Sequence, residues 1–368
     1  MAIIWVIVDK YIPLTKEVLW ETYYNLTQST TLIGRAFIDV WLRWDAVHYM
    51  NIARFGYQGV GVADTVFFPL YPYLVGGIFR LTNINVTLIG ILVSSIATFF
   101  ALVFLYELVM ELFKDKDLAK YSTICLAFYP TGFFLHAPYT DALFLALSIG
   151  SILFMVKKRP IIAGLFGCAA GLTRAQGILL LIPMIVMLIQ NFFTTKKNLN
   201  WKEFVGIILT ILGFAGYSYW RMQSGLDNFF TSYQTLSKAG FRFPLTNLFL
   251  GFKILINNQS LMLASELFSV LFFLVMLIWM ATNQKFKNQI AILAYSFSTW
   301  LLITSKTTYF ASPLQSANRY VLHIFFVFVG MGELIKKLSP EKKKIFFFIC
   351  LILSLLLLSL YPFWVFIG

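Results

Sequence analysis

A long apolar run, Val86–Phe113, reads VTLIGILVSSIATFFALVFLYELVMELF. Runs of about 20 apolar residues, enough for a helix to cross a bilayer, recur along the whole chain. Backbone polar groups inside a bilayer must be satisfied within the segment itself, so we expect helices throughout. The runs do not alternate apolar and polar residues, as the strands of an outer-membrane barrel would. The sequence therefore predicts an all-α polytopic membrane protein.

The composition supports this class. Of the 368 residues, 59% are hydrophobic and 12% are charged, whereas soluble domains have about 45–50% apolar and about 25% charged residues. The net charge of +13 is spread over short connections, without the basic face or tail that duplex binding requires, so we expect no nucleic-acid partner. The three cysteines, Cys125, Cys168 and Cys350, lie inside apolar runs and are interpreted as buried small hydrophobes.

The apolar runs predict ten spans. They are Val86–Phe113, Leu118–Leu135, Ala142–Val156, Ile161–Leu172, Ile178–Phe193, Phe204–Trp220, Leu261–Ala281, Ile290–Thr304, Val321–Ile335 and Ile345–Ile367. A further run, Ala2–Val8, ends at Asp9 and Lys10 and is too short for a span. Either the true start lies upstream, or these residues form the outer end of an eleventh span.

Lysines on alternate connections predict the orientation. Short cationic loops face the cytoplasm under the positive-inside rule. They are Lys114/Lys116, Lys157-Lys158-Arg159, Lys196-Lys197, Lys285/Lys287, Lys336-Lys337 and Lys342-Lys343-Lys344. The remaining connections then face outward: Lys10–Asn85, His136–Asp141, Thr173–Gly177, Arg221–Ser260 and Ser305–Tyr320. We expect one domain over residues 1–368, with a first outer loop (10–85) that carries interfacial helices and a transmembrane bundle (86–367). The mixture of aromatic and cationic residues in Arg221–Ser260 also predicts an interfacial helix.

Cations on the outward side are mostly arginines. They are Arg35, Arg43, Arg54, Arg80, Arg174, Arg221, Arg242 and Arg319. The planar guanidinium fork holds phosphate in a bidentate manner, which the compact ammonium group of lysine cannot do. Any single arginine can be an ordinary loop residue, but the set as a whole indicates phosphate recognition.

The densest polar cluster is Arg43-Trp44-Asp45-Ala46-Val47-His48-Tyr49-Met50-Asn51-Ile52-Ala53-Arg54-Phe55-Gly56-Tyr57. Ionisable groups near hydrocarbon cost free energy and mark functional sites. On a helix, Asp45, His48 and Tyr49 share one face, and a carboxylate there can take a proton from an attacking hydroxyl. The alternative is that Asp45 pairs with Arg43 or caps a helix. For His48 we favour hydrogen bonding over metal binding, because no clear third ligand accompanies it.

Three later clusters lie on predicted outward turns and could converge on one cavity. They are Phe128–Phe144, with His136, Tyr139 and Asp141; Gly171–Gly177, with Arg174 and Gln176; and Ser312–Tyr320, with Arg319. Thr140 or Asp141 also suits the start of a helix, where a side-chain oxygen accepts from free backbone amides.

The order of these motifs resembles that of the GPI mannosyltransferase II family (the PIG-V type), within the GT-C class of glycosyltransferases. The resemblance rests on Trp44–Tyr49, Ile52-Ala53 with Gly56-Tyr57, and Phe67-Phe68-Pro69-Leu70-Tyr71-Pro72, and it extends to the three later clusters. Two positions depart from the family pattern. Thr140-Asp141 replaces a common Ser-Glu pair, and Arg174-Ala175-Gln176-Gly177 replaces Arg-Ser-Asn-Gly. The resemblance therefore does not specify the acceptor or the sugar.

The resemblance implies an integral membrane glycosyltransferase with a GT-C-like fold. It would move a sugar, usually mannose, from a polyprenyl- or dolichyl-phosphate donor to a lipid or glycan acceptor. We expect inversion of configuration and Asp45 as general base. The donor is already activated and no Gly-rich nucleotide loop is present, so we expect no cofactor, with a divalent metal as the less favoured alternative. The site would be extracytoplasmic, in the plasma membrane of a bacterium or in the endoplasmic reticulum of a eukaryote. The alternative function is a transporter or flippase of a lipid-linked sugar.

The expected substrate-binding residues come from all four clusters. They are Arg43, Trp44, His48, Tyr49, Arg54, Tyr71, His136, Tyr139, Asp141, Arg174, Gln176 and Arg319.

Overall fold

The computed structural model describes residues 31–59, 62–195, 200–227, 229–237, 239–308 and 312–363. The run Ala2–Val8 and the loop at Lys196-Lys197 lie outside these residues. The helices are α3 (Leu32–Phe37), α4 (Asp45–Phe55), α5 (Leu70–Thr82), α6 (Val86–Phe113), α7 (Lys116–Ala127), α8 (Asp141–Val156), α9 (Pro160–Thr173), α10 (Leu181–Thr195), α11 (Trp201–Gln223), α12 (Phe229–Ser237), α13 (Pro244–Asn258), α14 (Leu261–Thr282), α15 (Ile290–Ser305), α16 (Ala317–Tyr320), α17 (Phe326–Lys336) and α18 (Pro340–Leu360). Strands β1 (Ala239–Phe241) and β2 (Lys306–Thr308) form one antiparallel pair.

Polar residues set the start of several long helices. The Asn85 side chain accepts from the amides of Thr87 and Leu88 at the start of α6, and Ser260 accepts from the amide of Leu263 at the start of α14. The first amides of a helix have no partner within the helix, so a side-chain oxygen here stabilises the end. These caps explain why the apolar runs begin as helices where they do.

The long helices are apolar enough to lie in a membrane. Among the described residues, five helices are long and apolar enough to cross one, and up to six if a bent pair forms one span. Helix α17 is buried almost throughout, whereas Cys350 is the one buried residue of α18. Beyond its charged first turns, leucine, isoleucine and phenylalanine form most of the surface of α18. A helix that is apolar on all sides and exposed to its surroundings suits a lipid environment. The predicted class, a helical polytopic membrane protein, is confirmed.

The expected count of ten spans is higher than the structure supports. The run Leu118–Leu135 is divided, because α7 ends at Ala127, just before Tyr129-Pro130, and a short 3-10 turn follows at Gly132–Leu135. The residue before a proline is disfavoured in the helical region, which explains the break. The run Val321–Ile335 is divided by a bend of 84° between Ala317–His323 and Phe326–Lys336. Three more runs form shorter apolar helices, α8, α9 and α15.

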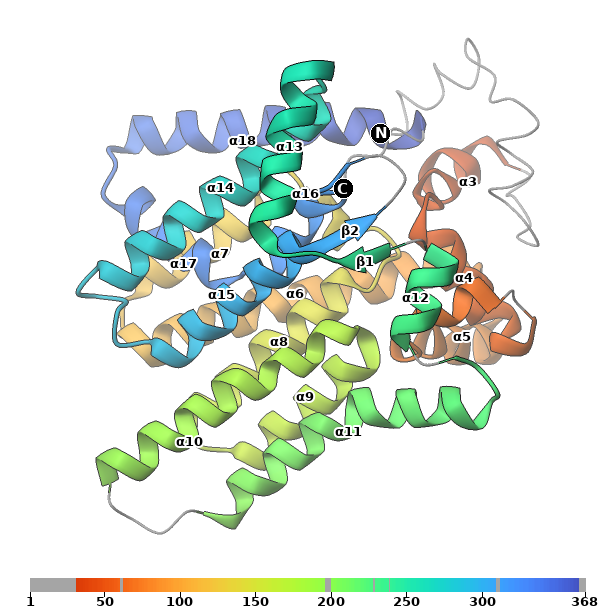
Figure 1. The fold of residues 1–368 in the computed structure, drawn as a ribbon. Coiled ribbons are helices and arrows are strands. Elements are labelled where there is room, and N and C mark those ends of the chain that lie inside the picture. The colour runs from red at the N-terminus through yellow and green to blue at the C-terminus, as the bar shows by residue number, and fades with distance from the viewer. Residues whose placement is uncertain are drawn as a thin grey trace.

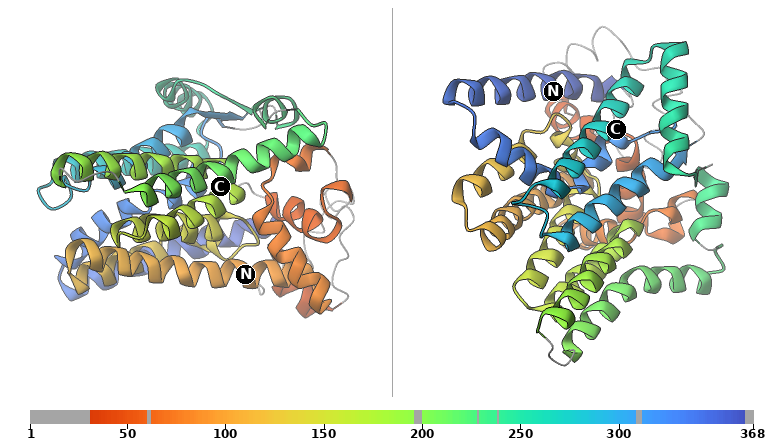
Figure 2. Two further views of the ribbon diagram at one scale, coloured as in Figure 1. Left: turned by 90° about the horizontal axis from the view of Figure 1, so that it is seen from below. Right: turned by 60° about the vertical axis from the view of Figure 1, so that its left-hand side comes forward.

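The two ends of the bundle differ in chemistry. Figure 1 shows the connections α6–α7, α8–α9, α14–α15 and α17–α18 at its left-hand end. The view from below in Figure 2 shows the red and orange helices α3, α4 and α5 gathered at the opposite end. At the lysine-bearing end, Lys285 and Lys336 both bind the Asp115 carboxylate, at 3.0 and 2.6 Å. The described lysine loops therefore share one end, as the predicted orientation requires.

Helices α9 and α11 pack without space for side chains. A Cβ at Gly167 would lie 2.3 Å from Thr210 Oγ1, and one at Gly213 would lie 2.1 Å from the Cys168 carbonyl oxygen. Small residues allow such close backbone approach between membrane helices. The pair matters for the site because Arg174 directly follows α9.

We expect Gly213→Ala to lower the free energy of unfolding by about 1–3 kcal/mol, because the added methyl group overpacks this contact. Gly216→Ala is the matched control on the same helix, since a Cβ there meets nothing within 4 Å. Thermal unfolding in detergent measures both variants. Equal melting temperatures would mean that α9 and α11 separate at little cost.

The β1–β2 pair joins two distant connections. Phe241 of β1 pairs with Lys306 of β2, which places the segment after α12 beside the end of α15. Figure 1 shows this pair close to α16 and on the same side of the molecule as α12. The sequence did not predict these strands, but they form one wall of the site described next.

Candidate active site

Asp45 begins α4 and faces a cavity. The preceding residue, Trp44, has a left-handed backbone (φ 53°), which turns the chain sharply into the helix. Such a conformation costs free energy for a residue other than glycine and is found at functional sites. The Asp45 side chain is 35% exposed, and its Oδ2 accepts a hydrogen bond from Arg319 Nη2 at 2.8 Å. This carboxylate is therefore held by an arginine from a distant part of the chain and remains accessible.

A second carboxylate, Asp141, binds both arginines from behind. It begins α8 and is only 1% exposed. Its Oδ1 lies 2.7 Å from Arg174 Nη1, 3.7 Å from Arg319 Nε and 3.1 Å from His323 Nε2. Buried charges are stable when they are paired in this way. Asp141 thus sets the position of Arg174 and Arg319 relative to each other.

A third cation, Lys306, lies beside the arginines. Its ammonium group donates to the Tyr320 hydroxyl at 2.9 Å and stands 4.6 Å from the centre of that ring. Arg319 Nη2 donates to the same hydroxyl at 3.1 Å. In the described part of the chain, no carboxylate lies within ion-pair distance of Lys306. The site thus contains three cations, Arg174, Arg319 and Lys306, and two carboxylates, so one positive charge is not compensated.

Glu266 of α14 holds the loop that leads to Arg319. Its carboxylate accepts from the Ser312 hydroxyl at 2.6 Å and from the Ser316 amide at 3.1 Å. Ser316 has a left-handed backbone (φ 70°) and precedes α16. Leaving these buried polar groups unpaired would cost free energy, so the two hydrogen bonds are maintained. They keep this strained turn, and with it Arg319, in place.

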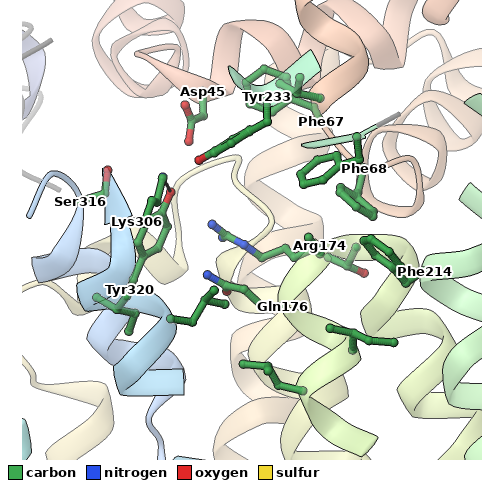
Figure 3. A pocket seen from close by; sticks show the side chains of 18 of the residues that line it. Asp45, Phe67, Phe68, Arg174, Gln176, Phe214, Tyr233, Lys306, Ser316 and Tyr320 are labelled. Carbon is green, nitrogen blue, oxygen red and sulfur yellow. Dashed lines mark hydrogen bonds between the residues drawn. The ribbon is translucent and has the colours of Figure 1, made fainter. Parts of the chain in front are cut away.

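The cavity has a volume of about 610 Å³ and two unlike walls. Figure 3 shows Arg174 and Gln176 reaching toward Lys306 and Tyr320, with Asp45 above them and with Phe68 and Phe214 farther off. The apolar wall comes from the 3-10 helix Ala175–Leu180, α11, α12, α15 and β1: Ile178, Leu179, Phe214, Phe229, Phe230, Phe241, Leu302 and Ile303. One wall therefore suits an anion, and the other suits hydrocarbon.

Electrostatic interactions keep Asp45 ionised. Burial alone would raise the pKa of this carboxyl, but the charge and hydrogen bond of Arg319 lower it by more, with smaller contributions from His48 and Lys306. The net result is a pKa below the ordinary value. Burial likewise lowers the pKa of Lys306, but Tyr233 and Tyr320 raise it by more, so the ammonium stays charged. At neutral pH the site has an anionic group at its mouth and cations within it.

The structure brings together part of the expected site. Five of the expected residues line the cavity, namely Asp45, Tyr49, Arg174, Gln176 and Arg319. Two lie directly behind it: Asp141, and Tyr139, whose ring lies 5.0 Å from the Arg319 guanidinium. The others do not line the cavity, and they are Arg43, Trp44, His48, Arg54, Tyr71 and His136.

Arg43 and Tyr71 are structural. The Arg43 side chain is fully buried and donates to the carbonyl oxygens of Asp39, Leu42 and Pro362. The Tyr71 hydroxyl donates to the Gly90 carbonyl at 2.9 Å. Buried donors need acceptors, and here the main chain supplies them. The expectation that these two side chains bind substrate is therefore corrected.

The other four expected binding residues point elsewhere. His48 pairs with Asp64 and stacks on Phe67, with 4.8 Å between ring centres. His136 lies 3.3 Å from the Ser95 hydroxyl, at the edge of α6. Arg54, in the last turn of α4, lies over the Phe55 ring. Trp44 contributes its backbone turn to the site. None of these four side chains lines the cavity, and the local motifs do not reveal this.

Sequence reasoning missed Lys306, Tyr320 and Tyr233, which all line the cavity. One signal could have found Lys306: it is a lysine on a connection assigned to the outside, against the positive-inside rule. Tyr320 was adjacent to a chosen arginine. The described residues contain no group of three or more His, Cys, Asp or Glu that could hold a metal ion. The expectation that the site holds no metal stays a prediction.

Comparison with solved structures gives the class of the protein. The fold is similar to that of ArnT from Cupriavidus metallidurans, with a TM-score of 0.56 over 84% of this chain and 61% of that chain, at 14% sequence identity. That crystal structure has undecaprenyl phosphate bound. The apo structure of the same enzyme gives a TM-score of 0.55. The chain is thus a polytopic helical membrane protein with a GT-C-type fold.

Sequence comparison gives the family. Residues 26–215, more than half of the chain, match the family model described as mannosyltransferase (PIG-V). The chain belongs to this family. GPI mannosyltransferase 2 of Schizosaccharomyces pombe is 30% identical over 150 residues, which are 40% of this chain and 32% of that protein. GPI mannosyltransferase 2 of Gibberella zeae is 29% identical over 120 residues, 32% of this chain and 28% of that protein. The chain thus matches about a third of the length of these curated relatives.

Proposed function

We propose that this protein is an inverting glycosyltransferase that moves mannose from a polyprenyl- or dolichyl-phosphate donor to a lipid or glycan acceptor. The observation that carries the proposal is a single cavity with an accessible carboxylate, Asp45, beside three cations and opposite an aromatic wall. Membership of the mannosyltransferase (PIG-V) family supports the reaction class, and the names of the two curated relatives support mannose as the sugar.

The cavity walls support a lipid phosphate as the donor. A phosphodiester has one negative charge, which matches the one positive charge that the named side chains leave uncompensated. Arginine and lysine hold phosphate through charge-assisted hydrogen bonds. The phenylalanine wall offers an apolar surface of the kind that a prenyl chain would contact. The undecaprenyl phosphate bound to ArnT, which has the same type of fold, agrees with this donor class.

The position of Asp45 supports its role as the base. The acceptor hydroxyl would enter beside Asp45, lose its proton to the carboxylate and attack the anomeric carbon from the face opposite the phosphate. The bond between that carbon and the phosphate oxygen would break, with the electron pair moving to the oxygen. Arg174, Arg319 and Lys306 would stabilise the charge that develops there. Such a displacement inverts the configuration.

The two ends of the bundle support an extracytoplasmic site. The site lies at the end that carries α3–α5 and α12, opposite the lysine loops that the positive-inside rule assigns to the cytoplasm (Figures 1 and 2). A transporter is less well supported, because the chain belongs to the mannosyltransferase (PIG-V) family.

The test uses the purified full chain in nanodiscs with decaprenyl-phosphate mannose and a panel of alkyl mannosides and glucosaminyl lipids. We expect release of decaprenyl phosphate together with a new glycoside of opposite anomeric configuration, which NMR identifies. Movement of the donor across a vesicle membrane without a new glycosidic bond would support transport instead and would overturn the proposal.

We expect Lys306→Gln to raise the donor KM about tenfold, equivalent to about 1.4 kcal/mol of lost binding free energy. Glutamine keeps the approximate length of the lysine side chain but removes the charge of the ammonium group, which has no carboxylate partner. Acceptor KM should change little. Lys253→Gln is the control, because Lys253 is exposed on α13 and does not line the cavity. Steady-state kinetics with decaprenyl-phosphate mannose measures both, and an unchanged donor KM would remove Lys306 from phosphate binding.

A further inference from the structure

Tyr320 stands among all three cations of the site. It ends α16, is 7% exposed and lines the cavity. Its ring centre lies 5.0 Å from the Arg174 guanidinium carbon, 4.9 Å from that of Arg319 and 4.6 Å from Lys306 Nζ. Cations are attracted to the face of an aromatic ring, so the three contacts also fix the orientation of the phenol. Figure 3 shows this side chain across from Arg174.

The hydroxyl of Tyr320 has an unusual set of partners. It accepts hydrogen bonds from Lys306 at 2.9 Å and from Arg319 at 3.1 Å. Neither cation can accept a hydrogen bond in return. The oxygen of the phenol is therefore occupied as an acceptor, and its own hydrogen remains to be donated. Among the residues that the structure describes, none accepts it.

Other buried tyrosines near the site differ in this respect. The Tyr139 hydroxyl donates to the Arg43 carbonyl at 2.8 Å, and the Tyr217 hydroxyl donates to the Thr65 carbonyl at 2.7 Å. Their hydrogens are used within the fold. A buried donor without an acceptor is costly, unless a ligand supplies one. Tyr320 is thus prepared for an acceptor atom that enters the cavity.

We propose that the Tyr320 hydroxyl donates a hydrogen bond to the phosphate oxygen that leaves the sugar, and that Tyr320 is a catalytic residue of the transfer. This inference rests on the proposed function. As the bond from the anomeric carbon to that oxygen breaks, the electron pair moves to the oxygen, and the hydrogen bond from Tyr320 strengthens. The proton of the acceptor hydroxyl goes to Asp45, and Tyr320 keeps its own. The two cations that bind the phenol oxygen make it a stronger donor.

The test is the removal of one oxygen atom. We expect Tyr320→Phe to lower kcat about 100-fold, in line with the loss of one donor to a developing oxyanion. Donor KM should stay within about threefold of the wild-type value, because the bond forms fully only in the transition state. Tyr217→Phe is the matched control. It removes a buried hydroxyl close to the site, but Tyr217 does not line the cavity, so its kcat should stay near wild type.

Ring-fluorinated tyrosines at position 320 separate donation from positioning. Fluorine changes the acidity of the phenol with little change in shape, so kcat should vary in a graded way along the series if the hydroxyl donates to the leaving oxygen. A Tyr320→Phe variant with wild-type kcat would overturn the role of Tyr320. So would a lowered kcat in Tyr320→Phe together with equal rates for all fluorinated variants.

Separate experiments test the proposed function and the role of Tyr320. Wild-type protein is assayed first with decaprenyl-phosphate mannose, and an absence of transfer would overturn the reaction itself. Binding of free decaprenyl phosphate, measured by intrinsic fluorescence, gives a readout that needs no turnover. We expect Tyr320→Phe to bind this product several-fold more weakly than the wild-type protein, because the hydrogen bond to the released oxygen is lost. Equal binding would also contradict the inference.

Discussion

Asp45→Asn is expected to lower the kcat of sugar transfer about 1,000-fold, the scale of a lost general base. The amide has the shape of the carboxylate but cannot take a proton. Its effect on folding should be small, because the side chain is 35% exposed and Arg319 keeps its second partner, Asp141. Initial rates with decaprenyl-phosphate mannose, together with the melting temperature in detergent, measure the two effects separately.

The control for this variant is Asp64→Asn. Asp64 is a nearby carboxylate that pairs with His48 and does not line the cavity, so transfer should continue. The pH dependence gives an independent check. Arg319 holds the pKa of Asp45 below its ordinary value, so the base stays ionised in mildly acidic solution. We therefore expect no acidic limb from Asp45 between about pH 5 and pH 7. Undiminished turnover in Asp45→Asn would exclude Asp45 as the base.

Asp141→Asn should have the largest effect on stability, about 3–5 kcal/mol, because it removes the anion from a buried ion network. The Asp141 carboxylate lies 2.7 Å from Arg174 and 3.7 Å from Arg319, and it is 1% exposed. Without it, two guanidinium groups remain close together with Asp45 as their nearest carboxylate. We expect a lower melting temperature and a fall in donor kcat/KM of at least about 100-fold, since both arginines would move.

Two comparisons identify the cause. Asp141→Glu keeps the charge and should retain more stability than Asp141→Asn. Decaprenyl phosphate should raise the melting temperature of Asp141→Asn more than that of the wild-type protein, because the ligand supplies the missing negative charge. Equal melting temperatures for the wild type and Asp141→Asn would mean that the network contributes little to the fold, and that the arginines are positioned by packing alone.

Much of the fold could be predicted because hydrophobicity is a local property. The run Val86–Phe113 has the same bounds in the sequence interpretation and in the structure. The Gly-xxx-Gly spacing of Gly167 and Gly171 predicts close helix packing, and the structure shows it, with α11 as the partner. The predicted number of spans was too high for two different reasons. In the run Leu118–Leu135 the cause is local, because Pro130 ends the helix. In the run Val321–Ile335 the cause is not local. The bend between α16 and α17 depends on how the buried residues around Ile324 and Phe325 pack.

The site was harder to predict because residues of the same type on similar connections have different contacts in the structure. Arg43 and Arg174 both lie on connections expected to face outward, yet Arg43 donates to main-chain carbonyls and Arg174 lines the cavity. Their local sequences do not distinguish them. Lys306 lies in a strand whose partner is more than 60 positions away, so its place beside Arg319 follows from the β1–β2 pairing.

The sequence alone determined that this chain is a helical membrane protein and where its longest apolar helices lie. It also determined that the described lysine loops share one end. Both follow because burial in lipid and charge at an interface depend on each residue's own chemistry. Only the tertiary structure decided which ionisable groups meet. The contact between Asp45 and Arg319 joins positions 274 residues apart. It exists because α4, α8 and α16 pack around one buried carboxylate, and no local pattern encodes the direction in which their side chains point.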